Sequence, residues 1–244
     1  HEVGTTDEDL ALAKAATGKA ASRNPKARFR KEFSVEDVLA SPMVADPLRL
    51  LEICATSDGA AAAIVVAGEV ARKLSKAPVW ITGIALASRT FGDPSLRTPT
   101  LSAHARPGVP SLSEAHNCVA DLWQRAGLGP QDIDLIELPD NSSWHYLTYL
   151  DIILGGANGT AERLLRSGAT DPMSGTRRVC AGGGASGSGE AVLAQGLLQI
   201  YELVTQLRGE AGDRQVAAKL RNAMAMTYGY LGNNAGCVLS LALP

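Results

Sequence analysis

A segment rich in glycine and serine, residues 180–190, contains the residues best suited to chemistry. A strand-like run ending at Cys180 leads into it, and an apolar-periodic run over residues 190–208 predicts a long helix after it. Glycines at such a junction let a ligand approach the backbone closely and expose N–H groups at a helix N-terminus. Glu190 closes the segment, and a carboxylate placed there can act as a general acid or base.

The composition is that of an ordinary globular protein. The 244 residues carry a formal net charge of -2, with 45% hydrophobic and 20% charged residues, which gives no support to nucleic acid as a partner. No apolar run reaches the roughly 20 residues that span a bilayer, so we expect a cytoplasmic protein with no membrane span. The cysteines Cys54, Cys118, Cys180 and Cys237 form no C-x-x-C pair, which favours a reduced protein over a disulfide scaffold or a metal site.

The elements that must position these residues alternate between strands and helices. Buried strands are predicted at residues 60–66, 79–88, 133–138 and 235–243. Helices are predicted at residues 6–16, 34–39, 69–75, 113–127, 146–154, 160–167 and 190–208, and residues 216–224 fit either type. This alternation indicates a layered α/β architecture.

Four segments stand in an order that resembles one known family. They are Ser57-Asp-Gly-Ala-Ala-Ala, Gly129-Pro-Gln-Asp-Ile-Asp-Leu-Ile-Glu-Leu, the glycine-rich segment, and Gln206-Leu-Arg-Gly-Glu-Ala-Gly-Asp-Arg-Gln. The chain resembles thiolase-like enzymes of the lipid-transfer, sterol-carrier-protein type over nearly its whole length. The early segments Gly4-Thr-Thr-Asp-Glu-Asp-Leu-Ala and Asn24-Pro-Lys-Ala-Arg-Phe-Arg resemble the same subgroup.

The resemblance implies a thiolase-like layered α/β fold, with mixed sheets between helices. Residues 1–77 would end the N-terminal half, including its loop region, and residues 78–244 would form the C-terminal half. The family's nucleophilic cysteine would lie in an N-terminal portion outside this chain. The implied partners are acyl-CoA, a second copy or the N-terminal half of the protein, or a small OB-fold protein. No cofactor is implied beyond acyl-CoA as the substrate.

The catalytic positions of the family are altered here. Its histidine after the glycine-rich segment corresponds to Glu190, and its His-Asp-Cys-Phe motif corresponds to Pro139-Asp-Asn-Ser. The closing glycine turn corresponds to residues 228–234, again without a cysteine. Ordinary thiolysis needs a thiolate and a base that activates it, so this set of residues argues against that reaction.

The resemblance and the residue types together define a candidate site. The predicted catalytic residues are Glu190, Asp140, Asn141, Tyr228 and Tyr230, and the predicted substrate-binding residues are Gly183, Gly184, Ser186, Gly189 and Asn233. Each has a structural alternative, because an acidic residue can stabilise a helix N-terminus and a buried tyrosine can simply pack. His145 is expected to be a packing or helix-surface residue, and Cys180 to be buried and inert.

Two classes of function remain open. The first is an enzyme acting on a C–C bond of an acyl-CoA, either a divergent acetyl-CoA acetyltransferase or a β-hydroxyacyl-CoA retro-aldolase, in lipid or steroid degradation. The second is a non-catalytic acyl-CoA-binding or structural subunit. Dinucleotide binding is excluded, because no acidic strand end follows the glycine-rich segment in a βαβ unit.

Overall fold

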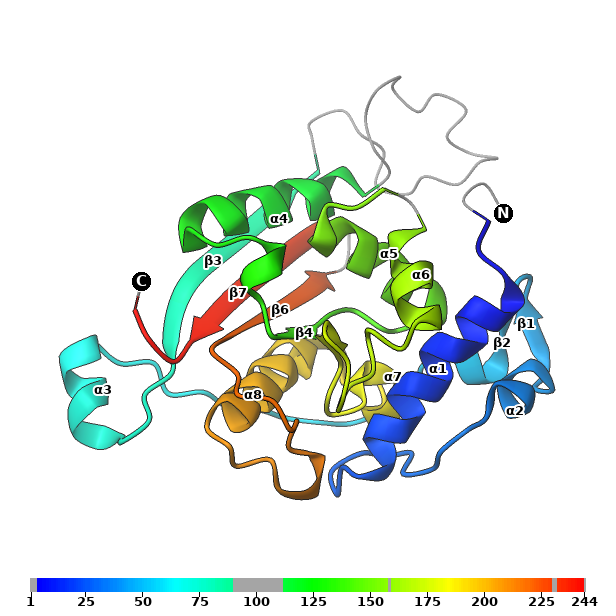
Figure 1. The fold of residues 1–244 in the computed structure, drawn as a ribbon, viewed down its shortest axis with the longest axis horizontal. Coiled ribbons are helices and arrows are strands. Elements are labelled where there is room, and N and C mark those ends of the chain that lie inside the picture. Colours follow the sequence, from blue (N-terminus) through cyan, green and yellow to red (C-terminus); the bar gives the residue numbers. More distant parts are fainter. Residues whose placement is uncertain (1–3, 90–111, 158, 230–231, 244) are drawn as a thin grey trace.

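The computed structural model describes residues 4–89, 112–157, 159–229 and 232–243 (Figure 1). Its helices are α1 (Asp7–Ser22), α2 (Val35–Leu39), α3 (Gly68–Leu74), α4 (Ser113–Ala126), α5 (Ser143–Leu154), α6 (Thr160–Arg166), α7 (Gly184–Ser188) and α8 (Gln195–Leu207). Its strands are β1 (Met43–Ala45), β2 (Leu48–Arg49), β3 (Trp80–Ser88), β4 (Leu135–Glu137), β5 (Arg178–Val179), β6 (Asn222–Gly229) and β7 (Asn233–Ser240). Short 3₁₀ helices lie at Leu50–Glu52, Pro130–Asp132, Val192–Ala194 and Gly212–Arg214.

A five-stranded mixed sheet organises the chain, in the order β3-β7-β6-β4-β5. The pairs β3–β7 and β7–β6 are antiparallel, whereas β4 runs parallel to both β6 and β5. Strands β1 and β2 form a separate antiparallel pair. The layered α/β prediction is confirmed, and the ambiguous residues 216–224 end in the first part of β6.

Helices cover the two faces of the sheet because alternate residues of each strand point to opposite sides. Met224 and Met226 of β6 belong to the same core cluster as Leu122 of α4, whereas Ala223 and Ala225 pack in a second cluster with α8. On the α4 side, glycines in the strands permit close approach. A Cβ on Gly83 of β3 would lie only 2.8 Å from the Cβ of Ala126.

One part of the sheet has no covering helix on the α8 side. Helix α8 packs on β6 and β4, and the outer residues of β3 stay exposed, with Ile84 at 62% and Leu86 at 71%. Leu193 and Leu197, next to these residues, are also exposed. Among the described residues, this is an apolar sheet face of the kind that a neighbouring layer normally covers.

Helix α1 starts at a capping box. Thr6 accepts a hydrogen bond from the backbone N–H of Asp9, and Asp9 accepts one from the backbone N–H of Thr6 in return. The acidic first turn suits the positive end of the helix dipole. This helix packs against α7, α5 and α6, so it supports the glycine-rich segment from one side (Figure 1).

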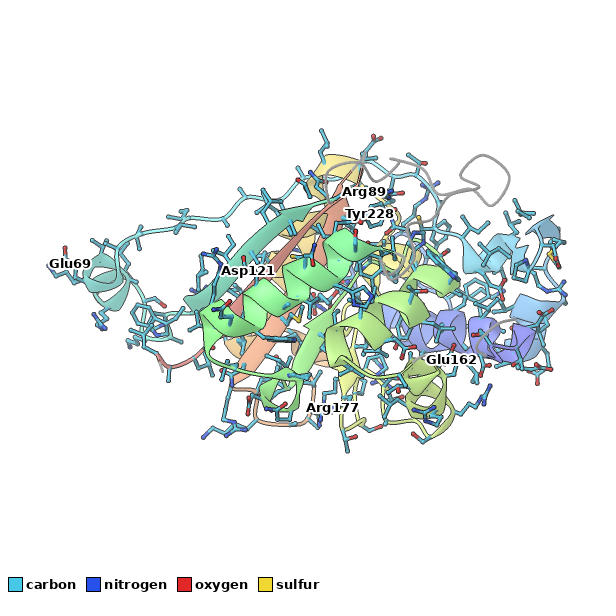
Figure 2. The ribbon with its side chains drawn as sticks, turned by 90° about the horizontal axis from the view of Figure 1, so that it is seen from above. Glu69, Arg89, Asp121, Glu162, Arg177 and Tyr228 are labelled. Atoms are coloured by element: carbon cyan, nitrogen blue, oxygen red, sulfur yellow. The ribbon has the colours of Figure 1, made fainter. Side chains whose placement is uncertain are left out.

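The prediction of a buried strand at residues 60–66 is wrong. These residues are extended and pair with none of the described strands, and Ile64 is 91% exposed. A strand needs a neighbour to satisfy its backbone groups, and hydrophobicity alone supplies none. The following helix, α3, buries no residue and stands apart from the sheet in both views, with Glu69 at its outer side (Figures 1 and 2).

The division at residues 77 and 78 stays a prediction. The other predicted strands and helices are present, although α1 continues to Ser22, well past its predicted end, and α8 starts later than predicted. The predicted cap of α4 lies at Gly127, which has a φ of +62°. In the part of the chain that the structure describes, no helix is both long and apolar enough to cross a membrane.

Candidate active site

The glycine-rich segment folds as a short helix, α7, whose first turn is held by Asp140. Asp140 follows β4 and is buried, and its carboxylate accepts hydrogen bonds from the backbone N–H groups of Ala185 (2.7 Å) and Ser186 (3.1 Å). Gly184 makes this contact possible, because a Cβ there would lie 2.1 Å from Asp140 Oδ2. Both oxygens of Asp140 therefore hold the backbone, and its catalytic role stays a prediction.

The opposite side of α7 is fastened to α1. Lys14 Nζ donates to both the backbone oxygen and the hydroxyl of Ser186, each at 2.9 Å. A Cβ on Gly183, whose φ is +93°, would lie 2.5 Å from the Cβ of Ala21. Gly183 and Ser186, which the sequence predicts to bind substrate, are thus buried between two helices and line neither of the cavities described below.

Asp140 and Lys14 interact as a buried acid and base. Burial raises the pKa of Asp140 to about 6, against the lowering effects of the two N–H groups and of Lys14. Burial lowers the pKa of Lys14, and Asp140 opposes that change. Each residue therefore favours the charged form of the other, and removal of either leaves a buried charge uncompensated.

Glu190 lies in extended backbone and not at a helix N-terminus. The N–H of Glu190 donates to the carbonyl of Ala55 (2.8 Å), and the carbonyl of Glu190 accepts from the N–H of Ser57 (2.9 Å). These two hydrogen bonds make a parallel β-bridge between Glu190 and Thr56. Helix α8 starts only at Gln195. The helix predicted over residues 190–208 therefore starts later than expected, with a 3₁₀ turn from Val192 and α8 from Gln195.

A cysteine that the sequence did not single out lies against Glu190. The thiol of Cys54 donates a hydrogen bond to Glu190 Oε2 (3.6 Å), and the N–H of Cys54 donates to the carbonyl of Asn141 (2.8 Å). Burial raises the pKa of Cys54 to about 12, with a further contribution from Glu190. Asn141, a predicted catalytic residue, is buried beside this pair.

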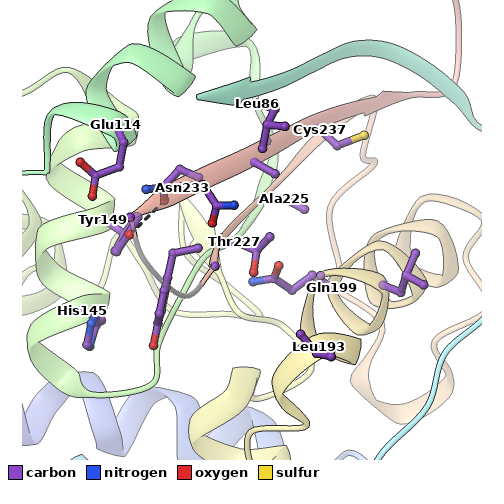
Figure 3. A pocket seen from close by; sticks show the side chains of 18 of the residues that line it. Leu86, Glu114, His145, Tyr149, Leu193, Gln199, Ala225, Thr227, Asn233 and Cys237 are labelled. Carbon is purple, nitrogen blue, oxygen red and sulfur yellow. Dashed lines mark hydrogen bonds between the residues drawn. The ribbon is translucent and has the colours of Figure 1, made fainter. Parts of the chain in front are cut away.

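Glu190 also lines a large cavity of about 830 Å³ between the sheet, α5 and the start of α8 (Figure 3). Its walls are largely apolar, and polar groups gather at one end. There the rings of His145 and Tyr228 stack with centroids 5.4 Å apart, and the hydroxyl of Tyr149 donates to Asn234 Oδ1 (3.0 Å). Arg89 lines the same end of the cavity, beside Tyr228 (Figure 2).

Five of the predicted site residues line one of the two cavities. Tyr228 and Asn233 line the large cavity with Glu190, whereas Gly184 and Gly189 line a smaller one. Tyr230 lies outside the described residues. All of these assignments stay predictions, since position in a cavity wall does not by itself establish a role.

The structure places His145 in the wall of the large cavity. It was expected to be a packing or surface residue, and it lines the large cavity while its Nδ1 lies 2.8 Å from the hydroxyl of Ser142. The available signal was its spacing of four residues from Tyr149, which places both on one face of a helix. The prediction started that helix at Tyr146 and so left His145 outside it.

The titration of His145 is expected to make stability fall in acid. Burial lowers the pKa of His145 to about 4, below the value near 6.5 of an unfolded histidine. Between these values the unfolded state binds more protons, so stability is lost as the pH falls from 6.5 towards 4. The free energy of unfolding, measured with denaturant, should therefore fall by roughly 2–3 kcal/mol less in His145→Gln than in the wild-type protein over this pH range. Identical pH dependence in the two proteins would contradict this prediction.

The smaller cavity, about 240 Å³, borders the glycine-rich segment and contains several polar side chains. It is lined by Glu137, Gln195, Gln199 and Glu202, and Gln199 also lines the large cavity. Glu202 is paired with Arg214 through two hydrogen bonds, at 3.1 and 3.0 Å. Burial, together with the nearby Glu202 and Asp140, raises the pKa of Glu137 well above its usual range.

A comparison with known families decides the membership of the chain. A family model described as thiolase C-terminal domain-like matches residues 95–240. The chain belongs to the thiolase-like family. The resemblance inferred from the motif order is thus confirmed, including its sterol-carrier character, since sterol carrier protein 2 of Bos taurus is 32% identical over 88% of this chain and 39% of its own length.

Other members of the thiolase-like family carry out named reactions. The acetyl-CoA acetyltransferase of Methanothermobacter thermautotrophicus is 36% identical over 88% of this chain and 54% of its own length. The 17-hydroxy-3-oxo-4-pregnene-20-carboxyl-CoA lyase of Mycobacterium tuberculosis is 33% identical over 86% of this chain and 52% of its own. The chain therefore spans about half the length of these two relatives.

A solved structure supports the fold assignment independently. The structure described as an Ltp2-ChsH2(DUF35) aldolase has a TM-score of 0.82, with 25% sequence identity. The match covers 98% of this chain and 60% of that one. The mixed sheet and its helices are therefore those of a thiolase-like protein.

Proposed function

We propose that this chain contributes the acid/base residues of a lipid-transfer-type protein that cleaves a C–C bond of a β-hydroxyacyl-CoA by a retro-aldol reaction. The carrying observation is that Glu190, a carboxylate, takes the family's histidine position and lines a large apolar cavity. A carboxylate can remove the proton of a β-hydroxyl group without any nucleophilic cysteine. The relatives named as a carboxyl-CoA lyase and as an aldolase support this reaction class.

The proposed reaction is a retro-aldol cleavage that transfers one proton from the β-hydroxyl group and one proton to Cα. Glu190 takes the proton of the β-hydroxyl group, the Cα–Cβ bond breaks, and its electron pair passes to the thioester as an enolate. The β-carbon leaves as a ketone or aldehyde, and protonation of the enolate at Cα gives a shortened acyl-CoA. Tyr228, at the polar end of the same cavity, is the residue we propose as the proton donor to the enolate.

The cysteines near the cavity argue against thiolysis by this chain. Burial raises the pKa of Cys54 to about 12 and that of Cys237, which lines the cavity, to about 11. Both are therefore protonated near neutral pH, whereas acyl transfer to sulfur requires a thiolate. A nucleophilic cysteine supplied by another segment or subunit would restore the acetyltransferase alternative, and the experiment below distinguishes the two.

The acyl group and the partners belong to the same proposal. A cavity of about 830 Å³ with largely apolar walls suits a bulky lipid or steroid side chain, with acyl-CoA as the substrate and no other cofactor. Ile84, Leu86, Leu193 and Leu197 are exposed walls of this same cavity, and a second α/β half or subunit lying over them would close it around the acyl group. A cytoplasmic location is supported by the free state of all four cysteines.

The decisive assay uses the protein at its natural length, alone and mixed with candidate partner subunits whose association is followed by size-exclusion chromatography. A β-hydroxyacyl-CoA should yield a ketone or aldehyde and one shortened acyl-CoA, without consumption of free CoA. Turnover of only a β-ketoacyl-CoA, with consumption of free CoA, would establish thiolysis instead. Tight binding of both esters without turnover of either would establish the non-catalytic alternative.

A further inference from the structure

The contact between Cys54 and Glu190 is fixed by backbone hydrogen bonds on both sides. The segment that contains Cys54 is fixed at two points, because its backbone bonds to Asn141 on one side and pairs with Glu190 on the other. These bonds place the thiol within 3.6 Å of Glu190 Oε2. The backbone of Glu190 is held by the same pairing, so thiol and carboxylate are set by one short ladder.

The two oxygens of Glu190 are used differently. Oε2 accepts the thiol hydrogen bond, whereas Oε1 accepts no hydrogen bond from the described residues, and the side chain lines the acyl-CoA cavity. A carboxylate held through one oxygen keeps the other in a defined direction. An acid/base group needs such a fixed geometry, because proton transfer depends on a heavy-atom distance of about 3 Å.

We propose that Cys54 is a positioning residue whose protonated thiol holds the Glu190 carboxylate for proton abstraction from the substrate. This inference rests on the proposed function. The thiol acts as a hydrogen-bond donor and forms no bond to the acyl group. Cys54 thereby takes part in the reaction only through Glu190.

Two substitutions distinguish a Cys54 thiol that donates a hydrogen bond to Glu190 from one that acts as a nucleophile. Cys54→Ala removes the donor and should lower kcat roughly 10-fold, the equivalent of one hydrogen bond, with little change in KM. Cys54→Ser restores a donor and should recover most of that loss. Cys118→Ala, which removes a buried thiol of α4 outside both cavities, is the matched control and should leave kcat unchanged.

The opposite results would overturn the proposal. A nucleophilic Cys54 would make the serine variant as inactive as the alanine variant. It would also leave an acylated Cys54 that acid quenching and mass spectrometry detect in the wild-type protein. Equal kcat in all the variants would show that the contact has no effect on the reaction.

A measurement without turnover keeps this inference separate from the proposed function. The infrared S–H stretching band of Cys54 can be identified by its loss in Cys54→Ala. A thiol that donates to a carboxylate should absorb at lower frequency than one that donates to an amide, so the band should move to higher frequency in Glu190→Gln. An unmoved band would refute the contact, even if the protein cleaves its substrate. A shifted band with no cleavage would refute the proposed function and, with it, the catalytic purpose of the contact.

Discussion

Replacement of Glu190 by glutamine is expected to lower the rate of β-hydroxyacyl-CoA cleavage by roughly 10²-fold or more. Glutamine keeps the size of the side chain and still accepts a hydrogen bond from Cys54, but its amide cannot take up the hydroxyl proton. The backbone pairing of residue 190 with Ala55 and Ser57 does not involve the side chain, so the variant should fold normally. The initial rate at saturating substrate, measured on the natural-length protein, tests this prediction.

The control for this experiment is Glu210→Gln, which removes an exposed carboxylate outside both cavities. Its rate should equal that of the wild-type protein. If Glu190→Gln also cleaves at the wild-type rate, Glu190 is not the base and the proposed mechanism fails. If its thermal unfolding differs markedly from that of the wild-type protein, the rate should be compared again at a temperature where both are folded.

Replacement of Asp140 by asparagine is expected to destabilise the fold by about 2–4 kcal/mol, because it disrupts charge-assisted hydrogen bonds and removes a buried compensating charge. The new amide presents an N–H₂ group where the backbone N–H of Ala185 or Ser186 now donates to an oxygen. It also leaves Lys14, which is buried, without the carboxylate that compensates its charge. Both effects act on the first turn of α7, so denaturant unfolding should show a lower midpoint.

Two further variants make this prediction specific. Asp121→Asn removes a carboxylate from the exposed pair with Arg125 and should cost less than about 1 kcal/mol. Adding Lys14→Met to Asp140→Asn should recover part of the loss, because the uncompensated charge disappears with the lysine. A loss below about 1 kcal/mol in Asp140→Asn would show that Asp140 does not hold the loop, and would return it to consideration as an acid/base residue.

The elements of the C-terminal sheet could be predicted because their patterns are local. Residues 79–88 and 133–138 are short apolar runs next to turn signals, and residues 113–127 repeat their apolar positions with helical spacing before a glycine. These patterns depend on neighbours along the chain, which any single sequence displays. The order of the motifs indicated the thiolase-like family, and the match to the family model confirmed that membership.

Residues 60–66 show where local patterns fail. The run is as apolar as a buried strand, yet it is exposed and unpaired among the described residues. Pairing is a property of two segments, and an apolar sequence contains no information on whether its partner is present. The same reason explains Glu190, because it pairs with Thr56, 134 positions away in the sequence, at the point where the periodicity predicted the start of a helix.

The glycine-rich segment shows both what the sequence determines and what only the tertiary structure decides. Its residue types predicted a loop after a strand with an acidic residue at its end, and the family resemblance added the departure from the family's histidine. Only the tertiary structure decided the packing of its glycines, because Gly183 lies against α1 and Gly184 against the carboxylate of Asp140. Only the tertiary structure brought Cys54 to Glu190 and His145 to Tyr228. Residue types determine which chemistry is possible, whereas distances between remote side chains arise from packing, and packing is settled by the whole chain at once.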